Sequence, residues 1–544
     1  MRVFTAQLPL LRTRESAPPR PEDSRDGGAA RSGRRELSHG TQIALIIAGC
    51  LAVAALTLLF PSTPTYDPWA WILWGREITH LDLVTEGGPS WKPLPILFTT
   101  PFSLFGDDLA PYLWVWVARA AGLFGCAMAW RVANRLIGGG IYGALAGVSA
   151  FLALFASNKY VRDAALGNSE PLLAAVFLWA FERHLDGRRD HALYLGVAAA
   201  LLRPEVWPFL GLYGLWLWFA EPRLRLRMVL FAGLIPALWF LPEWWGASDP
   251  FRAGSRANAP NPGSAAFEQQ PSVALFKRFA ESTIAPVEAG TIVAIGVAIV
   301  AWFRRRTQGA ILALAALGFS WFALVAAMTE AGFAGNQRYL MVTTAAVSVL
   351  GGIGAVRMLQ GVELLARRGF GASERTGRIA AAAAFVAGIA IASPTIIAKA
   401  DNTARVQGGL DHEAFLWHDL KSLIDANGGK ERLLACGGIF SGPFQTQMVA
   451  YELGVHGINV GWKETPPPGV VFRTRTVPDG PLVTKPTDDR YRLVDQGGKW
   501  RLLTVPPEGN ERGACPAASA DAPTAPAPPG ASLGKAPVKV IGQD

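Results

Sequence analysis

Acidic and basic side chains gather in four short segments of the sequence that lie between long apolar runs. The first segment places a carboxylate between an aromatic residue and a proline, in Tyr66-Asp67-Pro68. Charged groups beside the apolar runs of a membrane protein are costly, so they are hypotheses of function by default. The candidate site residues in the four segments are Asp67, Glu77, Lys92, Asp163, Glu170, Arg203, Glu205, Arg338 and Tyr339.

These residue types suit a displacement reaction on a phosphate-bearing ligand. A partly desolvated carboxylate such as Asp67 is suited to accept a hydroxyl proton as a general base. Lys92, Arg203 and Arg338 are suited to bind phosphate, arginine as a bidentate fork and lysine as a point charge. The pattern therefore predicts a site that binds a lipid-linked phosphate, activates an acceptor hydroxyl and releases the lipid phosphate after displacement at a sugar carbon.

Simpler structural roles are open for several of these residues. Asp67 could cap a helix, and Glu170 could be a favourable charge at a helix start. Glu77 lies in a predicted interfacial helix, where a solvated position would explain it, and Lys92 could be a snorkelling anchor. Arg119, inside a predicted span, could either pair with a carboxylate or snorkel.

Familiar motifs of soluble enzymes are missing from the sequence. It contains no Gly-rich phosphate loop, CxxC, HExxH or serine nucleophile elbow. His412 and His456 stand apart from acidic and cysteine clusters, so a metal site built on them is not favoured.

The composition indicates what positions these residues. Of 544 residues, 51% are hydrophobic and 17% are charged, with a mean hydropathy of +0.24. These values exclude a disordered chain and disfavour a soluble enzyme, so we expect a polytopic helical membrane protein. The apolar segments that predict eleven spans are 42–60, 111–130, 140–157, 169–184, 191–202, 206–220, 228–245, 286–303, 309–328, 338–356 and 379–399.

The distribution of basic residues predicts the orientation. Arginines concentrate in alternate loops, such as 304–306 and 357–378, which places the N-terminus in the cytoplasm and residues after 400 outside. The formal charge of +9 therefore reflects topology and does not indicate nucleic acid. All four candidate segments fall on the outer side.

Two of the predicted spans are short and enclose charged residues. The runs 191–202 and 206–220 flank Arg203-Pro204-Glu205, which suggests a broken hairpin that lines a wet cavity. A single kinked helix is the alternative. It would invert the rest of the topology, and the arginine distribution disfavours it.

The predicted organisation has four parts. Residues 1–41 form a disordered cytoplasmic tail, 42–399 the membrane domain, 400–506 a small α/β domain and 507–544 a Pro/Ala-rich disordered tail. In the α/β domain we expect helices at 412–426 and 444–453, a strand at 432–436 and a hairpin at 491–505. Cys436 and Cys515 lie outside under this topology, where a disulfide between them is permitted, although spacing alone leaves the pairing open.

The order of the short motifs resembles the integral-membrane C-type glycosyltransferases that use polyprenyl-phosphate sugars. The resemblance is to the branch of protein mannosyltransferases and lipid A aminoarabinose transferases. Asp67 stands at its acidic position after the first span, and Lys92-Pro-Leu-Pro95 resembles its Lys-Pro-Pro-Leu element. Glu170, Arg203-Pro-Glu205 and Arg338-Tyr339 match further motifs, and the likeness covers roughly residues 42–399.

The resemblance implies the fold and the reaction. The fold would be a helical membrane bundle with a small extracytoplasmic α/β domain, in a bacterial cytoplasmic membrane. The enzyme would move a hexosyl or pentosyl group from a polyprenyl-phosphate donor to a protein, glycan or lipid acceptor with inversion. Asp67 would act as base and Lys92, Arg203 and Arg338 would hold the phosphate.

Two points are left open by this resemblance. Relatives often have Asp-Glu where this sequence has Asp67-Pro68, so a divalent metal is an open expectation and no other cofactor is expected. The competing functions are a transporter or flippase of lipid-linked intermediates, which would distribute charges through the bilayer depth, and a non-catalytic envelope assembly factor.

Overall fold

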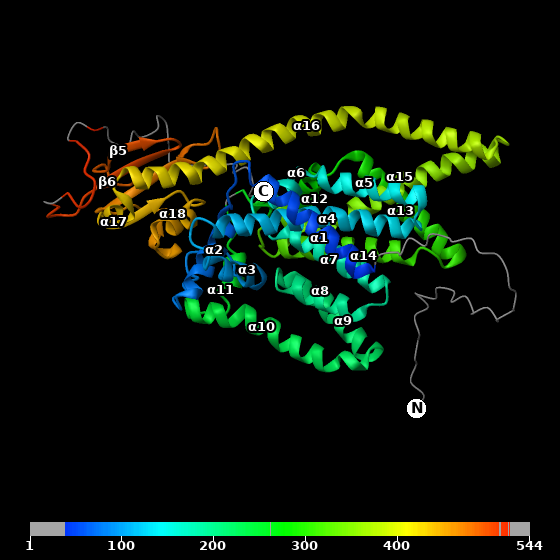
Figure 1. Cartoon of the computed structure of the whole chain (residues 1–544), viewed down its shortest axis with the longest axis horizontal. Coiled ribbons are helices and arrows are strands. Elements are labelled where there is room, and N and C mark those ends of the chain that lie inside the picture. Colours follow the sequence, from blue (N-terminus) through cyan, green and yellow to red (C-terminus); the bar gives the residue numbers. More distant parts are fainter. Residues whose placement is uncertain (1–37, 262, 511–512, 520–521, 523–544) are drawn as a thin grey trace, which may run out of the picture.

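The computed structural model describes residues 38–261, 263–510, 513–519 and 522. They form a helical bundle and a small domain with a sheet at one end of it (Figure 1). Residues 1–37, most of the predicted N-terminal tail, lie outside the described residues.

Each of the eleven predicted apolar segments coincides with one helix over most of its length. These helices are α1 (His39–Thr57), α4 (Ala110–Ile137), α5 (Gly140–Phe155), α7 (Glu170–Leu185), α8 (Arg189–Ala200), α9 (Trp207–Ala220), α10 (Arg225–Ala247), α13 (Ala285–Arg305), α14 (Gly309–Glu330), α15 (Met341–Gly369) and α16 (Glu374–Ala426). The shorter helices are α2 (Tyr66–Thr79), α3 (Pro93–Ser103), α6 (Asn158–Ala165), α11 (Arg252–Ala257) and α12 (Pro271–Ser282). Single 3₁₀ turns are η1 (Pro204–Val206), η2 (Pro222–Leu224), η3 (Ala265–Phe267), η4 (Gln337–Leu340) and η5 (Gly457–Asn459).

The described helices differ in their ability to cross a membrane. Seven are long and apolar enough, or up to eight if α5 and α6, bent by 66°, form one span. Helices α7, α8 and α9 have 16, 12 and 14 residues, fewer than the ~20 that a straight crossing needs. Length and composition therefore do not establish eleven crossings.

Helix α15 forms the centre of the bundle. It packs against α5, α13 and α14, and nearly all of its residues from Met341 to Val356 are buried. A Cβ at Gly354 would come within 1.7 Å of the Gly290 carbonyl oxygen, so the α13–α15 contact requires glycine. Small residues allow this close approach, which favours dispersion contacts between helices in a lipid environment.

The predicted break between 191–202 and 206–220 is present. Arg203 has an extended backbone and Pro204 begins η1, so the chain changes direction between α8 and α9. The backbone N–H of Leu94 donates to the Leu201 carbonyl at 3.0 Å, which fixes the start of α3 against this break.

The C-terminal domain contains one mixed sheet. Its strands are β1 (Gly438–Ser441), β2 (Val460–Gly461), β3 (Gly469–Arg475), β4 (Leu482–Val483), β5 (Arg492–Gly497) and β6 (Trp500–Val505). The order is β2-β1-β3-β6-β5, with β4 beside β3; β1 is parallel to both neighbours, and β3, β6 and β5 are antiparallel. Helices α17 (Gly429–Leu434) and α18 (Thr446–Leu453) complete the domain.

Three expectations for this domain are confirmed and one is wrong. The predicted helix at 412–426 is the last part of α16. The hairpin is β5–β6, and α18 matches the predicted second helix. The predicted strand at 432–436 is instead the end of α17 and a turn, with β1 starting only at Gly438. A short apolar run such as Leu433-Leu434-Ala435 does not distinguish a buried helix from a buried strand.

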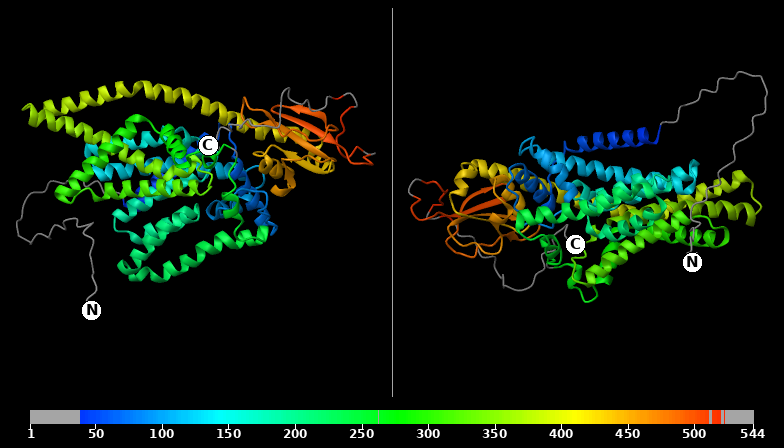
Figure 2. Two further views of the ribbon diagram at one scale, coloured as in Figure 1. Left: turned by 180° about the vertical axis from the view of Figure 1, so that it is seen from behind. Right: turned by 90° about the horizontal axis from the view of Figure 1, so that it is seen from below.

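Helix α16 joins the two parts of the molecule. Its 53 residues run without interruption along the edge of the bundle into the C-terminal domain, as Figures 1 and 2 show. The predicted change of domain at 399/400 falls inside this helix. It marks a change in composition from apolar to polar and not a break in the backbone.

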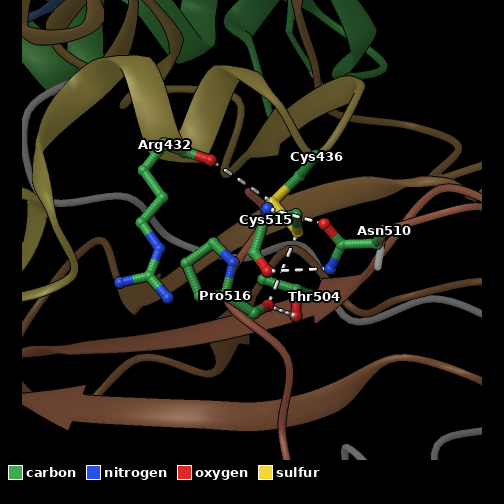
Figure 3. The surroundings of a disulfide bond; sticks show 6 residues. All are labelled: Arg432, Cys436, Thr504, Asn510, Cys515 and Pro516. Carbon is green, nitrogen blue, oxygen red and sulfur yellow. Dashed lines mark hydrogen bonds between the residues drawn. A yellow bond between two sulfur atoms is a disulfide. The ribbon is translucent and has the colours of Figure 1, made fainter. Parts of the chain in front are cut away.

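A disulfide joins Cys436 to Cys515, with the Cα atoms 4.8 Å apart (Figure 3). The side chain of Asn510 bonds both the N–H and the carbonyl of Cys515, and Thr504 donates to the Pro516 carbonyl at 2.7 Å. Residues 513–516 are therefore held against β6, although the composition predicted an unstructured tail from 507. The other two cysteines, Cys50 and Cys126, are free.

Candidate functional site

Eight of the nine predicted site residues form one connected cluster. They come from α2, the start of α3, α6, the start of α7, the α8–α9 break and η4. The members are Asp67, Lys92, Asp163, Glu170, Arg203, Glu205, Arg338 and Tyr339. Asp163 is connected to the others through Asn168. Segments up to 271 residues apart in the sequence thus meet at one place.

Asp67 and Arg338 form the most accessible pair in this cluster. The Arg338 Nη2 donates to Asp67 Oδ2 at 2.8 Å, and the side chains are 17% and 13% exposed. The N-cap of α2 is Thr65, and Asp67 lies in the first turn. Asp67 is therefore not the helix cap, and its carboxylate is directed to an arginine of η4 that lies 271 residues away in the sequence.

Glu170 is shared between two cations. Its Oε1 lies 3.0 Å from Lys92 Nζ and 3.7 Å from Arg203 Nη1, and the Glu170 side chain is fully buried. Lys92 also donates to Ser169 Oγ at 2.9 Å. Burial lowers the pKa of Lys92, and the Glu170 carboxylate opposes that shift. Lys92 is thus a buried ion-pair partner and not a snorkelling anchor.

Arg203 links the cluster to Tyr339 and Glu205. Its guanidinium lies 4.0 Å from the centre of the Tyr339 ring and its Nε is 3.7 Å from Glu205 Oε1. Arg203 Nη2 and Glu205 Oε2 are buried and have no hydrogen-bond partner among the described residues. Buried polar atoms in native proteins are nearly always paired, so such atoms are suited to a ligand or to ordered water.

Asp163 is connected to Arg338 through the side chain of Asn168. Its side chain is fully buried, and its Oδ1 accepts from Asn168 Nδ2 at 3.0 Å. The Asn168 Oδ1 in turn accepts from Arg338 Nη1 at 3.2 Å. Sequence reasoning did not select Asn168, and its only sequence signal is its place two residues before Glu170.

A metal site is not apparent among these carboxylates. The part of the chain that the structure describes has no group of three or more His, Cys, Asp or Glu side chains that could hold a metal ion. Asp67 and Glu170 are each paired with a cation of the protein. The divalent metal expected from the sequence therefore stays a prediction.

Glu77 is not part of the cluster. It is buried, accepts from the Val84 N–H at 3.1 Å and pairs with His456 Nδ1 at 2.8 Å. Burial raises the pKa of Glu77, while the bonds from Val84 and His456 lower it. Glu77 therefore joins α2 to the C-terminal domain at a buried position, so the solvated position considered from the sequence does not describe it, and its substrate contact stays a prediction.

The tryptophans of the first loop are buried and are not interfacial anchors. Trp69, Trp71, Trp74 and Trp91 have at most 2% of their surface exposed. Trp69 packs edge-on against Trp417 of α16, with ring centres 5.1 Å apart. These rings belong to the buried core that packs α2 against its neighbours.

The chain was compared with protein families, curated proteins and solved structures. Neither a protein-family model nor a curated protein matches the sequence. Among solved structures, ArnT from Cupriavidus metallidurans in the apo state matches over 86% of this chain and 98% of that chain, with a TM-score of 0.50 and 15% identity. The chain has the fold of ArnT.

ArnT is a lipid A aminoarabinose transferase and a C-type glycosyltransferase. The fold expected from the motif resemblance is therefore confirmed. At 15% identity the likeness establishes the fold, and the chemistry must be argued from the site itself.

Proposed function

We propose that this protein is a membrane glycosyltransferase that moves a sugar from a polyprenyl-phosphate donor to an acceptor hydroxyl with inversion. It would act at the outer face of a bacterial cytoplasmic membrane. The observation that carries the proposal is the cluster itself, in which Asp67 pairs with Arg338 while Glu170 pairs with Lys92 and Arg203, on an ArnT-like fold.

The charge arrangement supports a phosphate-bearing donor. Lys92 and Arg203 share the Glu170 carboxylate, and Arg203 Nη2 has no hydrogen-bond partner among the described residues, so a donor is left for a phosphate oxygen. Arg338 holds Asp67 with one terminal nitrogen. A donor phosphate would compete with Asp67 for this guanidinium, because a phosphate oxygen is also a strong acceptor for a bidentate arginine.

The reaction then needs a single displacement. The acceptor oxygen forms a bond to the anomeric carbon while the bond from that carbon to the phosphate oxygen breaks. The hydroxyl proton passes to the Asp67 carboxylate, and the electron pair leaves with the polyprenyl phosphate. Lys92, Arg203 and Arg338 stabilise the charge that grows on the leaving phosphate, and such preorganised donors act more strongly in the transition state than in the ground state.

Replacement of the proposed base tests this mechanism. Asp67→Asn retains an acceptor for Arg338 but removes the proton acceptor, so kcat should fall about 10²- to 10⁴-fold. The measurement is release of polyprenyl phosphate by purified protein in lipid discs, with a panel of polyprenyl-phosphate hexoses, pentoses and amino sugars.

The matched control is Asp489→Asn, which makes the same change at an exposed position of the C-terminal domain. It should leave turnover unchanged. Normal turnover by Asp67→Asn would refute the role of Asp67. Lack of release from every donor by the unaltered protein would refute the proposed function and favour a transporter or assembly factor.

A further inference from the structure

The contacts behind the proposed site form a chain of four side chains. Asp163 Oδ1 accepts from Asn168 Nδ2 at 3.0 Å, Asn168 Oδ1 accepts from Arg338 Nη1 at 3.2 Å, and Arg338 Nη2 donates to Asp67 Oδ2 at 2.8 Å. Asp163 and Asn168 are buried, whereas Arg338 and Asp67 are partly exposed. The chain therefore leads from a buried carboxylate to the accessible one.

The chemistry of the two outer partners explains why an amide lies between them. An ionised carboxylate only accepts hydrogen bonds and a guanidinium only donates them. A group that joins Asp163 to Arg338 must therefore donate on one side and accept on the other. The Asn168 amide does both, and its orientation is fixed because a reversed amide would place donor against donor and acceptor against acceptor.

The backbone around Asn168 is also held in place. The Asn168 N–H donates to the Asp163 carbonyl at 2.8 Å, and Trp114 Nε1 donates to the Gly167 carbonyl at 2.8 Å. The Thr65 N–H, at the start of α2, donates to the Leu166 carbonyl at 2.9 Å. The loop that carries Asn168 is thus hydrogen-bonded to the residue that begins α2, the helix that carries Asp67.

We propose that Asn168 is a positioning residue, which orients the Arg338 guanidinium toward Asp67 and the donor phosphate through its paired bonds to Asp163 and Arg338. The inference rests on the proposed function and adds a residue that acts through Arg338. Without the amide, the guanidinium keeps Asp67 as a partner but loses the contact that fixes the direction of its second terminal nitrogen.

Three variants test this role in the donor-release assay. Asn168→Ala should lower kcat about 10- to 100-fold, the effect of one hydrogen bond to a charged group, with little change in KM for the donor. The loss falls on kcat because charge on the leaving phosphate grows in the transition state. Asn168→Asp should be at least as impaired, because it places two carboxylates in contact.

The double variant Asp163→Asn/Asn168→Asp is the decisive measurement. It reverses the direction of the buried hydrogen bond, keeps the net charge and still offers Arg338 an acceptor, so it should recover most of the kcat lost in Asn168→Asp. A purely structural role of Asn168 would change the yield or the melting temperature but not kcat per folded molecule. If Asn168→Ala is too unstable to purify, the kcat of the double variant relative to that of Asn168→Asp still tests the role of Asn168.

Asn427→Ala is the matched control, because Asn427 also donates to a carboxylate, Asp495 Oδ2, at 2.8 Å, but within the C-terminal domain. Its kcat and KM should equal those of the unaltered protein. Unchanged kcat in folded Asn168→Ala, or a folded double variant as inactive as Asn168→Asp, would overturn the inference. Both results can be obtained only if the unaltered protein shows turnover. If the unaltered protein shows no turnover, the proposed function is refuted, and the role of Asn168 that rests on it is refuted as well.

Discussion

Arg119 shows how a charged residue inside an apolar helix can be purely structural. It lies within α4, and its guanidinium donates to the Thr57 carbonyl and hydroxyl at 2.9 and 3.1 Å and to the Ala165 carbonyl at 3.2 Å. Thr57 ends α1 and Ala165 ends α6, so Arg119 satisfies the last carbonyls of two helices. Arg119 therefore neither pairs with a carboxylate nor snorkels, which were the two roles considered from the sequence.

Loss of this guanidinium should destabilise the bundle without touching the site. Arg119→Ala leaves two helix ends without a cationic donor, so we expect a loss of about 2 kcal/mol or more in unfolding free energy. Thermal unfolding of the protein in detergent should show a lower melting temperature. Arg223→Ala, which removes a 67% exposed arginine, should not shift it, because surface pairs contribute little. Equal melting temperatures of the two variants would contradict this role for Arg119.

At the scale of elements, α2 connects the site to the C-terminal domain. Asp67 occupies its first turn, whereas Arg76 near its end lies 4.4 Å from the centre of the Tyr451 ring of α18 and donates to the Tyr451 carbonyl at 3.0 Å. Trp69 also packs against Tyr451, with ring centres 5.2 Å apart. The position of α2, and with it of Asp67, therefore depends on contact with α18.

Removal of the Tyr451 side chain should loosen α2 in particular. Tyr451 is 3% exposed and its hydroxyl donates to the Asp107 carbonyl at 2.9 Å, so Tyr451→Ala removes packing and a hydrogen bond from one interface. We expect faster amide hydrogen exchange in α2 and α18, with little change in β3 and β6, and a lower turnover. Phe415→Ala, at a 45% exposed position on α16, is the control and should leave α2 protected. Unchanged exchange in α2 of Tyr451→Ala would show that α18 does not hold it.

At the scale of the whole molecule, the open point is the side of the membrane on which the C-terminal domain lies. Helix α16 leads from the bundle to a domain that contains the Cys436–Cys515 disulfide. Structural disulfides persist in oxidising compartments, which agrees with the basic-residue distribution in favouring an outer location for this domain.

The proposed topology can be measured with introduced cysteines. With Cys50 and Cys126 replaced by alanine, Asp489→Cys should react with a membrane-impermeant maleimide in intact spheroplasts, because residue 489 would face outward. Ser32→Cys should react only after the cells are permeabilised. The opposite pattern would invert the proposed orientation and would place the Asp67 cluster on the cytoplasmic side.

The sequence by itself determined the helical class, the break at Arg203-Pro204-Glu205 and most members of the site. These features are local or periodic: apolar runs of a given length predict helices, and charges beside such runs are too costly to be accidental. It also predicted the β5–β6 hairpin, which has its turn signal in Gly497-Gly498.

Only the tertiary structure decided which charges pair. Glu77 and Glu170 look alike in the sequence, yet one contacts His456 of the C-terminal domain and the other Lys92 of the first loop. Asn168 carries no sequence signal of its own, and its role follows from the simultaneous approach of Asp163 and Arg338. Which charged side chains pair depends on contacts between segments that are distant in the sequence. Short-range sequence patterns do not encode these contacts, because the packing of the helices sets the distances between the side chains.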